Sequence, residues 1–381
     1  MPEEKEIILD DRIQKVGIVA EQAFKELNSI QTGSKKIVRT GEDMFDCHIG
    51  GLLPGDCVLI AGNPSSGKSE TLYRMIDKMM SKEVNSNSEN FVSLEFSMEM
   101  KMLNKLLRSS HNILKKKKSE ILFNKFNEEE AIKIKEYYEN LQDDRRYVVQ
   151  SPVTPEEFYK MSRDFCLNQK TKDCVLISAD HILLFMGTDK QGVLEKISEY
   201  INLLKLEFSN VYFILISQTN RSYNSIIKEK SNEMVPTNNL IYGSSFMEQL
   251  ASYIIIITNP FKQGISQYLK FKKDRYDYLE DFFGEEDKNE KVSFDTISRL
   301  FFFLTKARET DHPSKNLFIK EMDLSKEEKQ KMRDSLERDK IETAKTISLP
   351  TFENFNSTAP LPTVKPFDAF GQSFEKDTPP F

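Results

Sequence analysis

The sequence lacks long apolar runs, paired cysteines and an excess of positive charge. No apolar stretch approaches the roughly 18 residues of a membrane span, so we expect no membrane association. The four cysteines show neither CxxC spacing nor a nearby His-x-x-x-His, which argues against zinc and favours reduced thiols in an intracellular protein. Lys and Arg total 54 against 60 Asp and Glu, a net charge of -6 that excludes a uniformly basic nucleic-acid coat. A local basic channel remains compatible with that balance.

Short apolar runs alternate with longer helical patterns from residue 51 onward, which is typical of repeated β-α units. Several runs are apolar without alternation, as expected for strands covered on both faces. The sequence therefore predicts an α/β fold with a mainly parallel central sheet flanked by helices. The parallel strands are expected at 57–62, 91–96, 146–151, 174–180, 211–218 and 253–258, and an antiparallel edge pair at 300–307 and 316–323.

The chain divides into four parts by composition. Residues 1–40 contain an amphipathic helix at 11–28 and a polar linker, and this helix could dock on its own domain or on a neighbouring subunit. Residues 41–324 form the α/β domain, within which the highly charged stretch 261–298 is expected to be an exposed excursion. A charged helix is predicted at 325–348. Residues 349–381 are predicted to be a disordered tail, because six of the chain's 14 prolines lie there.

The strongest local signal is Gly62-Asn63-Pro64-Ser65-Ser66-Gly67-Lys68-Ser69, a complete GxxxxGK[ST] between a hydrophobic strand and a helical pattern. Glycines let the backbone curl so that its N–H groups face phosphates, Lys68 supplies positive charge, and the Ser69 hydroxyl can ligate magnesium. The motif predicts binding of ATP with Mg²⁺. The alternative is a degenerate loop that binds no nucleotide.

Two carboxylates at strand ends are candidates for the chemistry. Asp180 ends VLISAD, where it would face the phosphate site and hold Mg²⁺, although it could instead cap a helix. Glu95 lies within FVSLEF, on the strand expected beside the phosphate loop, and could polarise the attacking water.

Polar side chains on later strands add further candidates. Gln218 and Arg221 in FILISQTNR could sense the γ-phosphate and link it to the following loop, but Gln218 could equally satisfy a backbone group. Lys306 and Arg308 in FLTKAR are spaced i, i+2 and so point from one face of a strand. They would meet either solvent or another charge, such as a nucleotide bound to a neighbouring subunit.

Taken in order, these segments resemble the C-terminal ATPase domain of DnaB-type replicative helicases, a RecA-like fold. The parallels are GLLPGDCVLIAGNPSSGKS, SLEFSMEM, LISADHILLF, ISQTNRS, SSFMEQLASYIIII and TKAR, and together they cover about residues 11–323. With only about 50 residues before the sheet, the chain resembles a minimal phage-like form without the family's N-terminal domain.

The resemblance implies residue roles. Lys68 and Ser69 would bind ATP-Mg, Asp180 would belong to the metal site, and Glu95 would be the catalytic base. Gln218 would be the γ-phosphate sensor, and Lys306 with Arg308 the pair inserted into a neighbour's site.

The resemblance also implies an assembly and a function. The chain would form a homo-hexamer through its N-terminal helix and translocate on single-stranded DNA in the bacterial cytoplasm, in uninfected or phage-infected cells. Primase or other replisome proteins would be further partners. The alternative function is a RecA-like recombinase or filament-forming DNA-dependent ATPase that does not unwind.

Two regions are candidates for contact with DNA or partners. The family's usual arginine and acidic residue are missing before Glu248-Gln249, so backbone amides of Gly243, Ser244 and Ser245 are the first candidates for DNA phosphate. The second group, Arg221, Lys228 and Lys230, could equally be a solvated loop. The tail ends FEKDTPPF, which resembles the docking peptide of bacterial single-stranded-DNA-binding proteins, or is an inert solubilising tail.

Overall fold

The computed structural model describes most of the chain up to residue 334. The described residues are 16–32, 37–114, 116, 118–141, 144–220, 236–265, 267–272, 291–307, 317–321, 329–332 and 334. The chain divides into two units, Met1–Arg333 and Asp334–Phe381, and every element named below lies in the first. Among the described residues, no helix combines the length and the apolar character that crossing a membrane requires.

An eight-stranded sheet forms the centre of this unit, in the order β10-β9-β6-β1-β5-β4-β2-β3. The six strands from β6 to β3 in that order pair in parallel, whereas β9 is antiparallel to both β6 and β10. The strands are β1 Cys57–Gly62, β2 Phe91–Ser97, β3 Arg146–Val149, β4 Cys174–Asp180, β5 Val211–Ile216, β6 Tyr253–Thr258, β9 Arg299–Ala307 and β10 Leu317–Glu321.

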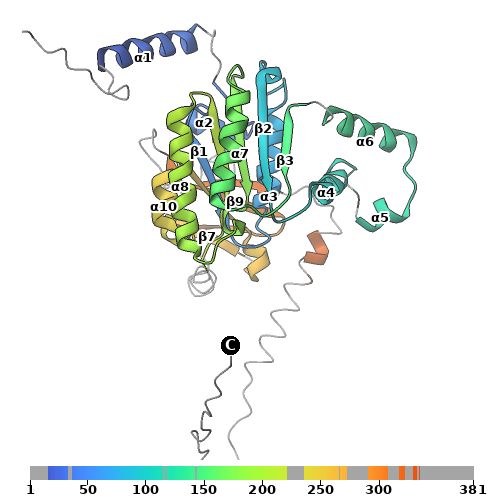
Figure 1. Cartoon of the computed structure of the whole chain (residues 1–381). Helices are drawn as coiled ribbons and strands as arrows, with labels where there is room; N and C mark the ends of the chain where they lie inside the picture. Colours follow the sequence, from blue (N-terminus) through green and yellow to red (C-terminus); the bar gives the residue numbers. More distant parts are fainter. Residues whose placement is uncertain are drawn as a thin grey trace, which may run out of the picture. The chain divides into compact units, whose positions relative to one another are not determined.

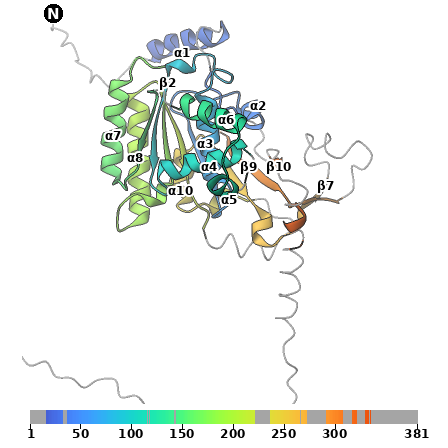
Figure 2. The same ribbon diagram turned by 90° about the vertical axis from the view of Figure 1, so that its right-hand side faces the viewer.

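Helices cover the sheet on both faces, which explains why strands β1, β2, β4, β5 and β6 are buried along their whole length. One core layer joins the sheet to α7, α8 and α10, and the other joins it to α2 and α3. Figures 1 and 2 show α7 and α8 together on the face opposite α3. The helices are α1 Val16–Gln31, α2 Asp43–Ile49, α3 Lys68–Met79, α4 Met102–Leu114, α5 Lys118–Phe123, α6 Glu128–Asn140, α7 Pro155–Asn168, α8 Lys190–Glu207 and α10 Ser244–Leu250.

Local sequence signals set several helix starts. Thr154 caps α7 through a capping box with Glu157, and Pro155 occupies the first turn. Asn127 and Glu130 form the same reciprocal pair at the start of α6. These caps satisfy N–H groups that the first helical turn leaves without intrahelical partners.

The eight predicted strands and the parallel order of the first six are confirmed, with small shifts in length. β3 ends at Val149 and β5 at Ile216, two residues earlier than predicted in each case. Helix α1 runs on to Gln31, beyond the predicted end at residue 28. Ser29 Oγ and Thr32 Oγ1 donate to backbone oxygens four residues earlier, which prolongs the last turns.

The predicted exposed excursion at 261–298 is wrong at its two ends. β7 Gln267–Lys272 and β8 Lys291–Asp295 pair as an antiparallel hairpin. Tyr268 is fully buried, with its ring centroid 5.0 Å from that of Phe301 on β9. The apolar face of Tyr268 therefore anchors the hairpin to the core despite the surrounding charges. Residues 273–290 lie outside the described part, as do almost all of 325–348 and the whole tail.

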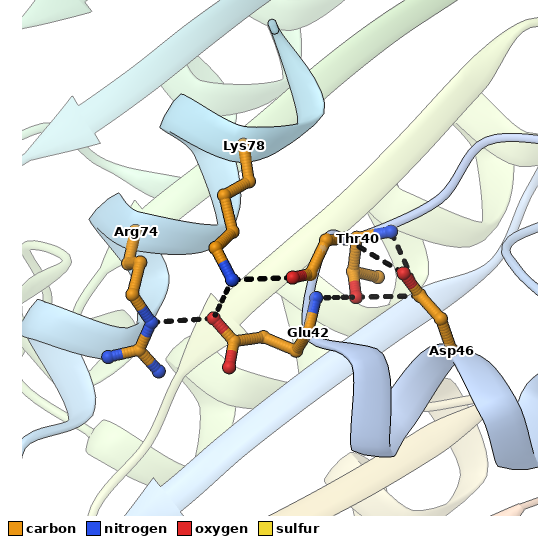
Figure 3. Close-up of polar contacts among 6 residues, drawn as sticks. Thr40, Glu42, Asp46, Arg74 and Lys78 are labelled. Atoms are coloured by element: carbon orange, nitrogen blue, oxygen red, sulfur yellow. Dashed lines mark hydrogen bonds and ion pairs between the residues drawn. The ribbon is translucent and has the colours of Figure 1, made fainter. Parts of the chain in front are cut away.

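A polar network fixes the segment that enters the domain against α3 (Figure 3). The Asp46 carboxylate accepts from Thr40 N, Thr40 Oγ1 and Gly41 N, at 2.7–2.9 Å. Glu42 pairs with Arg74 and Lys78 on α3, and Lys78 Nζ also donates to Gly41 O at 2.6 Å. The chain that follows the N-terminal linker is thus held on the helix whose first turn carries Lys68 and Ser69.

Candidate functional site

The phosphate-loop motif forms the predicted turn between β1 and α3. Gly62 has no room for a side chain, because a Cβ there would lie 2.3 Å from Ile257 O and 2.7 Å from Ser66 Oγ. Gly67 takes the left-handed conformation, with φ of 92°, at the N-cap of α3. Pro64 and Ser65 are exposed at the tip of the loop. Both glycines are therefore required by the backbone path itself.

Two groups inside the loop fit a bound phosphate. Ser66 Oγ is buried and has no hydrogen-bond partner among the residues that the structure describes. Lys68 Nζ is buried and donates to Asn63 O at 2.6 Å. Burial lowers the pKa of Lys68 to about 8, and the nearby charges of Glu99 and Asp180 only partly oppose this. A triphosphate would supply the negative charge that Lys68 lacks and an acceptor for Ser66.

Asp180 ends β4 and lies against the start of α3. Its Oδ1 accepts from Ser69 Oγ at 3.1 Å, and its Oδ2 accepts from Tyr73 OH and Lys105 Nζ, each at 3.2 Å. A hydroxyl and a carboxylate are oxygen ligands of the kind that Mg²⁺ prefers when nucleotide phosphates and water complete its shell. No group of three His, Cys, Asp or Glu in the described residues could hold a metal by itself. The site thus fits Mg²⁺ that arrives with a nucleotide.

Glu95 lies deeper in the sheet than Asp180. Its strand β2 pairs with β4 so that Glu95 is opposite Ser178, while Ser97 is opposite Asp180. Its Oε1 accepts from Arg146 Nε at 2.8 Å, and Arg146 also pairs with Asp77 of α3. Glu95 is almost completely buried in this ion cluster, which is a structural arrangement. Its predicted role as the base stays a prediction.

Glu99 is a carboxylate that the sequence reasoning missed. It follows β2 by two residues, and its backbone N donates to Asp180 O at 3.3 Å. Burial and then the charge of Asp180 raise the pKa of Glu99, while Lys68 and Arg108 oppose the shift. Glu99 is therefore within electrostatic range of both Lys68 and Asp180. The second glutamate of SLEFSMEM, just beyond the strand, is the signal that could have identified it.

Gln218 connects the site to neighbouring loops. Its Nε2 lies 3.1 Å from Nε2 of His181, the residue after Asp180, and its backbone O accepts from Tyr242 N at 3.0 Å. The next residue, Thr219, donates through Oγ1 to Asn63 Oδ1 in the phosphate loop. The end of β5 therefore touches the phosphate loop, the Asp180 strand and the segment before α10.

Comparison with known proteins identifies this arrangement. The family pattern described as the DnaB-like helicase C terminal domain matches residues 38–280. The chain belongs to this family. Among solved structures, an isolated ATPase domain superposes with a TM-score of 0.58 at 17% identity, covering 84% of this chain and 98% of that one. A DnaB-like replicative helicase, solved to show its interactions with primase, gives 0.55 at 16% identity, covering 84% of this chain and 66% of that one. Both likenesses confirm the predicted fold.

Lys306 of this DnaB-like domain lies at the opposite edge of the sheet from Asp180. On β9 it pairs with Ile254 near the start of β6, whereas the phosphate loop follows Gly62, which pairs with Ile257. Its Nζ donates to Glu248 O in α10. Leu300, six residues earlier on β9, approaches Gly67, so Lys306 is about 20 Å further along the strand. The structure does not bring Lys306 to its own phosphate site, and Arg308 lies outside the described residues.

The candidate DNA loop is described only in part. Gly243 is the left-handed N-cap of α10, and a Cβ there would lie 2.4 Å from Leu194 Cδ1. Ser245 is exposed, while the side chain of Ser244 is not described. Arg221, Lys228 and Lys230 lie outside the described residues. The roles of all six in DNA binding stay predictions.

Proposed function

We propose that the chain is an ATP-dependent hexameric replicative DNA helicase that translocates on single-stranded DNA. The observation that carries the proposal is the convergence of Lys68, Ser69, Asp180 and Glu99 at one edge of the sheet in a DnaB-like domain. The candidate cation Lys306 lies at the far end of β9, and Arg308 follows it by two residues in the sequence. A site that lacks Lys306 within one chain is suited to completion by a neighbouring subunit.

The residues of the site divide the work of phosphoryl transfer to water. Loop amides, Ser66 and Lys68 would hold the phosphates, and Lys68 would neutralise charge that develops on the transferred group. Ser69 and Asp180 would hold Mg²⁺, which supplies electrostatic stabilisation of the phosphate oxygens. We assign the proton of the attacking water to Glu99, since Glu95 is already paired with Arg146. Gln218 would sense the γ-phosphate and pass its presence to the loops it touches.

Helix α1 is our candidate for the contact between subunits. No residue of α1 is buried in the described part of the chain. Its exposed apolar side chains repeat at helical spacing and need a partner surface. They are Val16, Ile18, Val19, Phe24 and Leu27. We propose single-stranded DNA and primase as partners of the assembled ring in the cytoplasm, with the C-terminal tail as a further docking segment.

Unwinding of a forked duplex tests this function. With ATP and Mg²⁺ present, we expect the purified chain to form closed hexameric rings and to displace a labelled strand. Omission of the non-translocated tail of the fork should abolish displacement. ATP turnover on single-stranded DNA with helical filaments and no strand displacement would contradict the helicase proposal in favour of a RecA-like filament-forming ATPase.

Mixed rings test the proposed trans role of Lys306 and Arg308. We expect Arg308→Ala to inactivate the homomeric ring but to regain part of its turnover when mixed with Lys68→Ala subunits. Each variant then supplies the half-site that the other lacks. The control mixes Arg308→Ala with Lys306→Ala subunits, which share the defective half and should give no rescue. Equal activity in both mixtures would contradict the trans role.

A further inference from the structure

Lys105 is a buried cation in contact with the candidate metal ligand. It lies on α4, with only 8% of its side chain exposed, and its Nζ is 3.2 Å from Asp180 Oδ2. The same ammonium lies 3.9 Å from the centroid of the Tyr73 ring. A buried lysine is costly unless it is paired, so these two contacts are what hold the charge in place. Neither residue belongs to the phosphate-loop motif.

The contacts of Asp180 leave little room on one of its oxygens. Ser69 donates to Oδ1, whereas Tyr73 OH and Lys105 Nζ both donate to Oδ2. A carboxylate oxygen has about two lone-pair sites, so Oδ2 is saturated in this state. Water from a metal shell would have to replace one of the two donors. Lys105 is the one that Mg²⁺ disfavours, because two cations beside one carboxylate repel each other.

We propose that Lys105 is a built-in competitor of the divalent cation at Asp180. In the metal-free protein its ammonium neutralises the buried carboxylate, and it leaves Oδ2 when Mg²⁺ enters with the nucleotide. This inference rests on the proposed function, since it assumes that Asp180 receives Mg²⁺. Lys105 is thus a positioning residue that keeps the empty site stable and raises the Mg²⁺ concentration needed to fill it.

The exchange would also be felt outside the site. Lys105 is on the inner face of α4, and the next turn of that helix carries Ser110, whose Oγ is 2.8 Å from Tyr138 OH on α6. α4 begins only three residues after Glu99. Release of the Lys105 contact therefore frees the segment that connects the proposed base to α4 and α6.

A Mg²⁺ titration of nucleotide binding tests the inference on the full chain. A fluorescent, non-hydrolysable ATP analogue is held at fixed concentration, and the Mg²⁺ concentration for half-maximal binding is measured. We expect Lys105→Met to lower that concentration about tenfold. Lys105→Gln, which keeps a neutral donor, should lower it less. The matched control, Lys101→Met, removes an exposed lysine just before α4 and should leave it unchanged.

Thermal unfolding provides the second readout. In EDTA without nucleotide, Lys105→Met should unfold at a lower temperature than the wild type, because Asp180 loses its buried partner. Saturating Mg²⁺ and analogue should narrow that difference. An unchanged Mg²⁺ requirement in both Lys105 variants, or weaker analogue binding at every Mg²⁺ concentration, would overturn the inference, the latter by making Lys105 a phosphate ligand. Absence of Mg²⁺-dependent binding in the wild type would instead overturn the proposed function.

Discussion

Glu99→Gln is expected to lower ATP turnover by about a hundredfold to ten-thousandfold, the range that a positioned general base contributes. Binding of ATP should persist, because Lys68 and the loop amides are untouched. Steady-state turnover and equilibrium binding of a fluorescent analogue measure the two effects separately. Since the base acts in its deprotonated form, and burial raises the pKa of Glu99, wild-type turnover should fall as the pH drops through that raised pKa.

Glu95→Gln is the matched comparison, four residues before Glu99 in the sequence. It weakens the buried ion cluster with Arg146 and Asp77, so the main effect should be on stability. We expect a free energy of unfolding lower by about 1–3 kcal/mol, with turnover per folded subunit within a few-fold of wild type. If Glu95→Gln abolishes turnover while Glu99→Gln retains it, the base is Glu95, as the motif resemblance first implied.

Lys68→Ala is expected to abolish measurable ATP turnover and to weaken nucleotide binding by at least about a hundredfold. Lys68 is the buried ammonium at the phosphate loop, and in the empty site its charge is disfavoured by burial, which lowers its pKa to about 8. Bound triphosphate favours the charged form, so binding should weaken as the pH rises above about 8. Isothermal titration with the non-hydrolysable analogue measures this dependence.

The control for Lys68 is Lys82→Ala, which removes an exposed lysine just beyond the end of α3. It should leave both binding and turnover at wild-type levels. Because removing the charged, desolvated Lys68 relieves a burial cost, the Lys68 variant should be at least as stable as wild type without nucleotide. Wild-type nucleotide affinity in Lys68→Ala would contradict the phosphate site.

The sequence predicted the sheet well because its physical signals are local and strong. Runs such as CVLIAG and YIIIIT are buried on both faces, and a doubly covered parallel sheet leaves them few alternatives. The phosphate loop was equally predictable, since Gly62 and Gly67 are needed for the backbone path whatever the rest of the chain does.

Tertiary contacts decided the features that were missed. Glu95 and Glu99 are equivalent in a strand-and-loop pattern, and only the position of Arg146, 51 positions from Glu95, shows that Glu95 is already paired. Tyr268 lies among charged residues, yet Phe301 gives it an apolar surface to pack on. The contact of Lys105 with Asp180 joins residues 75 positions apart, which no local pattern reveals.

ATP turnover by the wild-type chain, measured against increasing single-stranded DNA, tests the central claim most directly. We predict turnover that needs Mg²⁺, rises to saturation with DNA, and loses its DNA response steeply as salt increases, because phosphate contacts release counterions. Turnover that is absent, or that is the same with and without single-stranded DNA at low salt, would contradict the account.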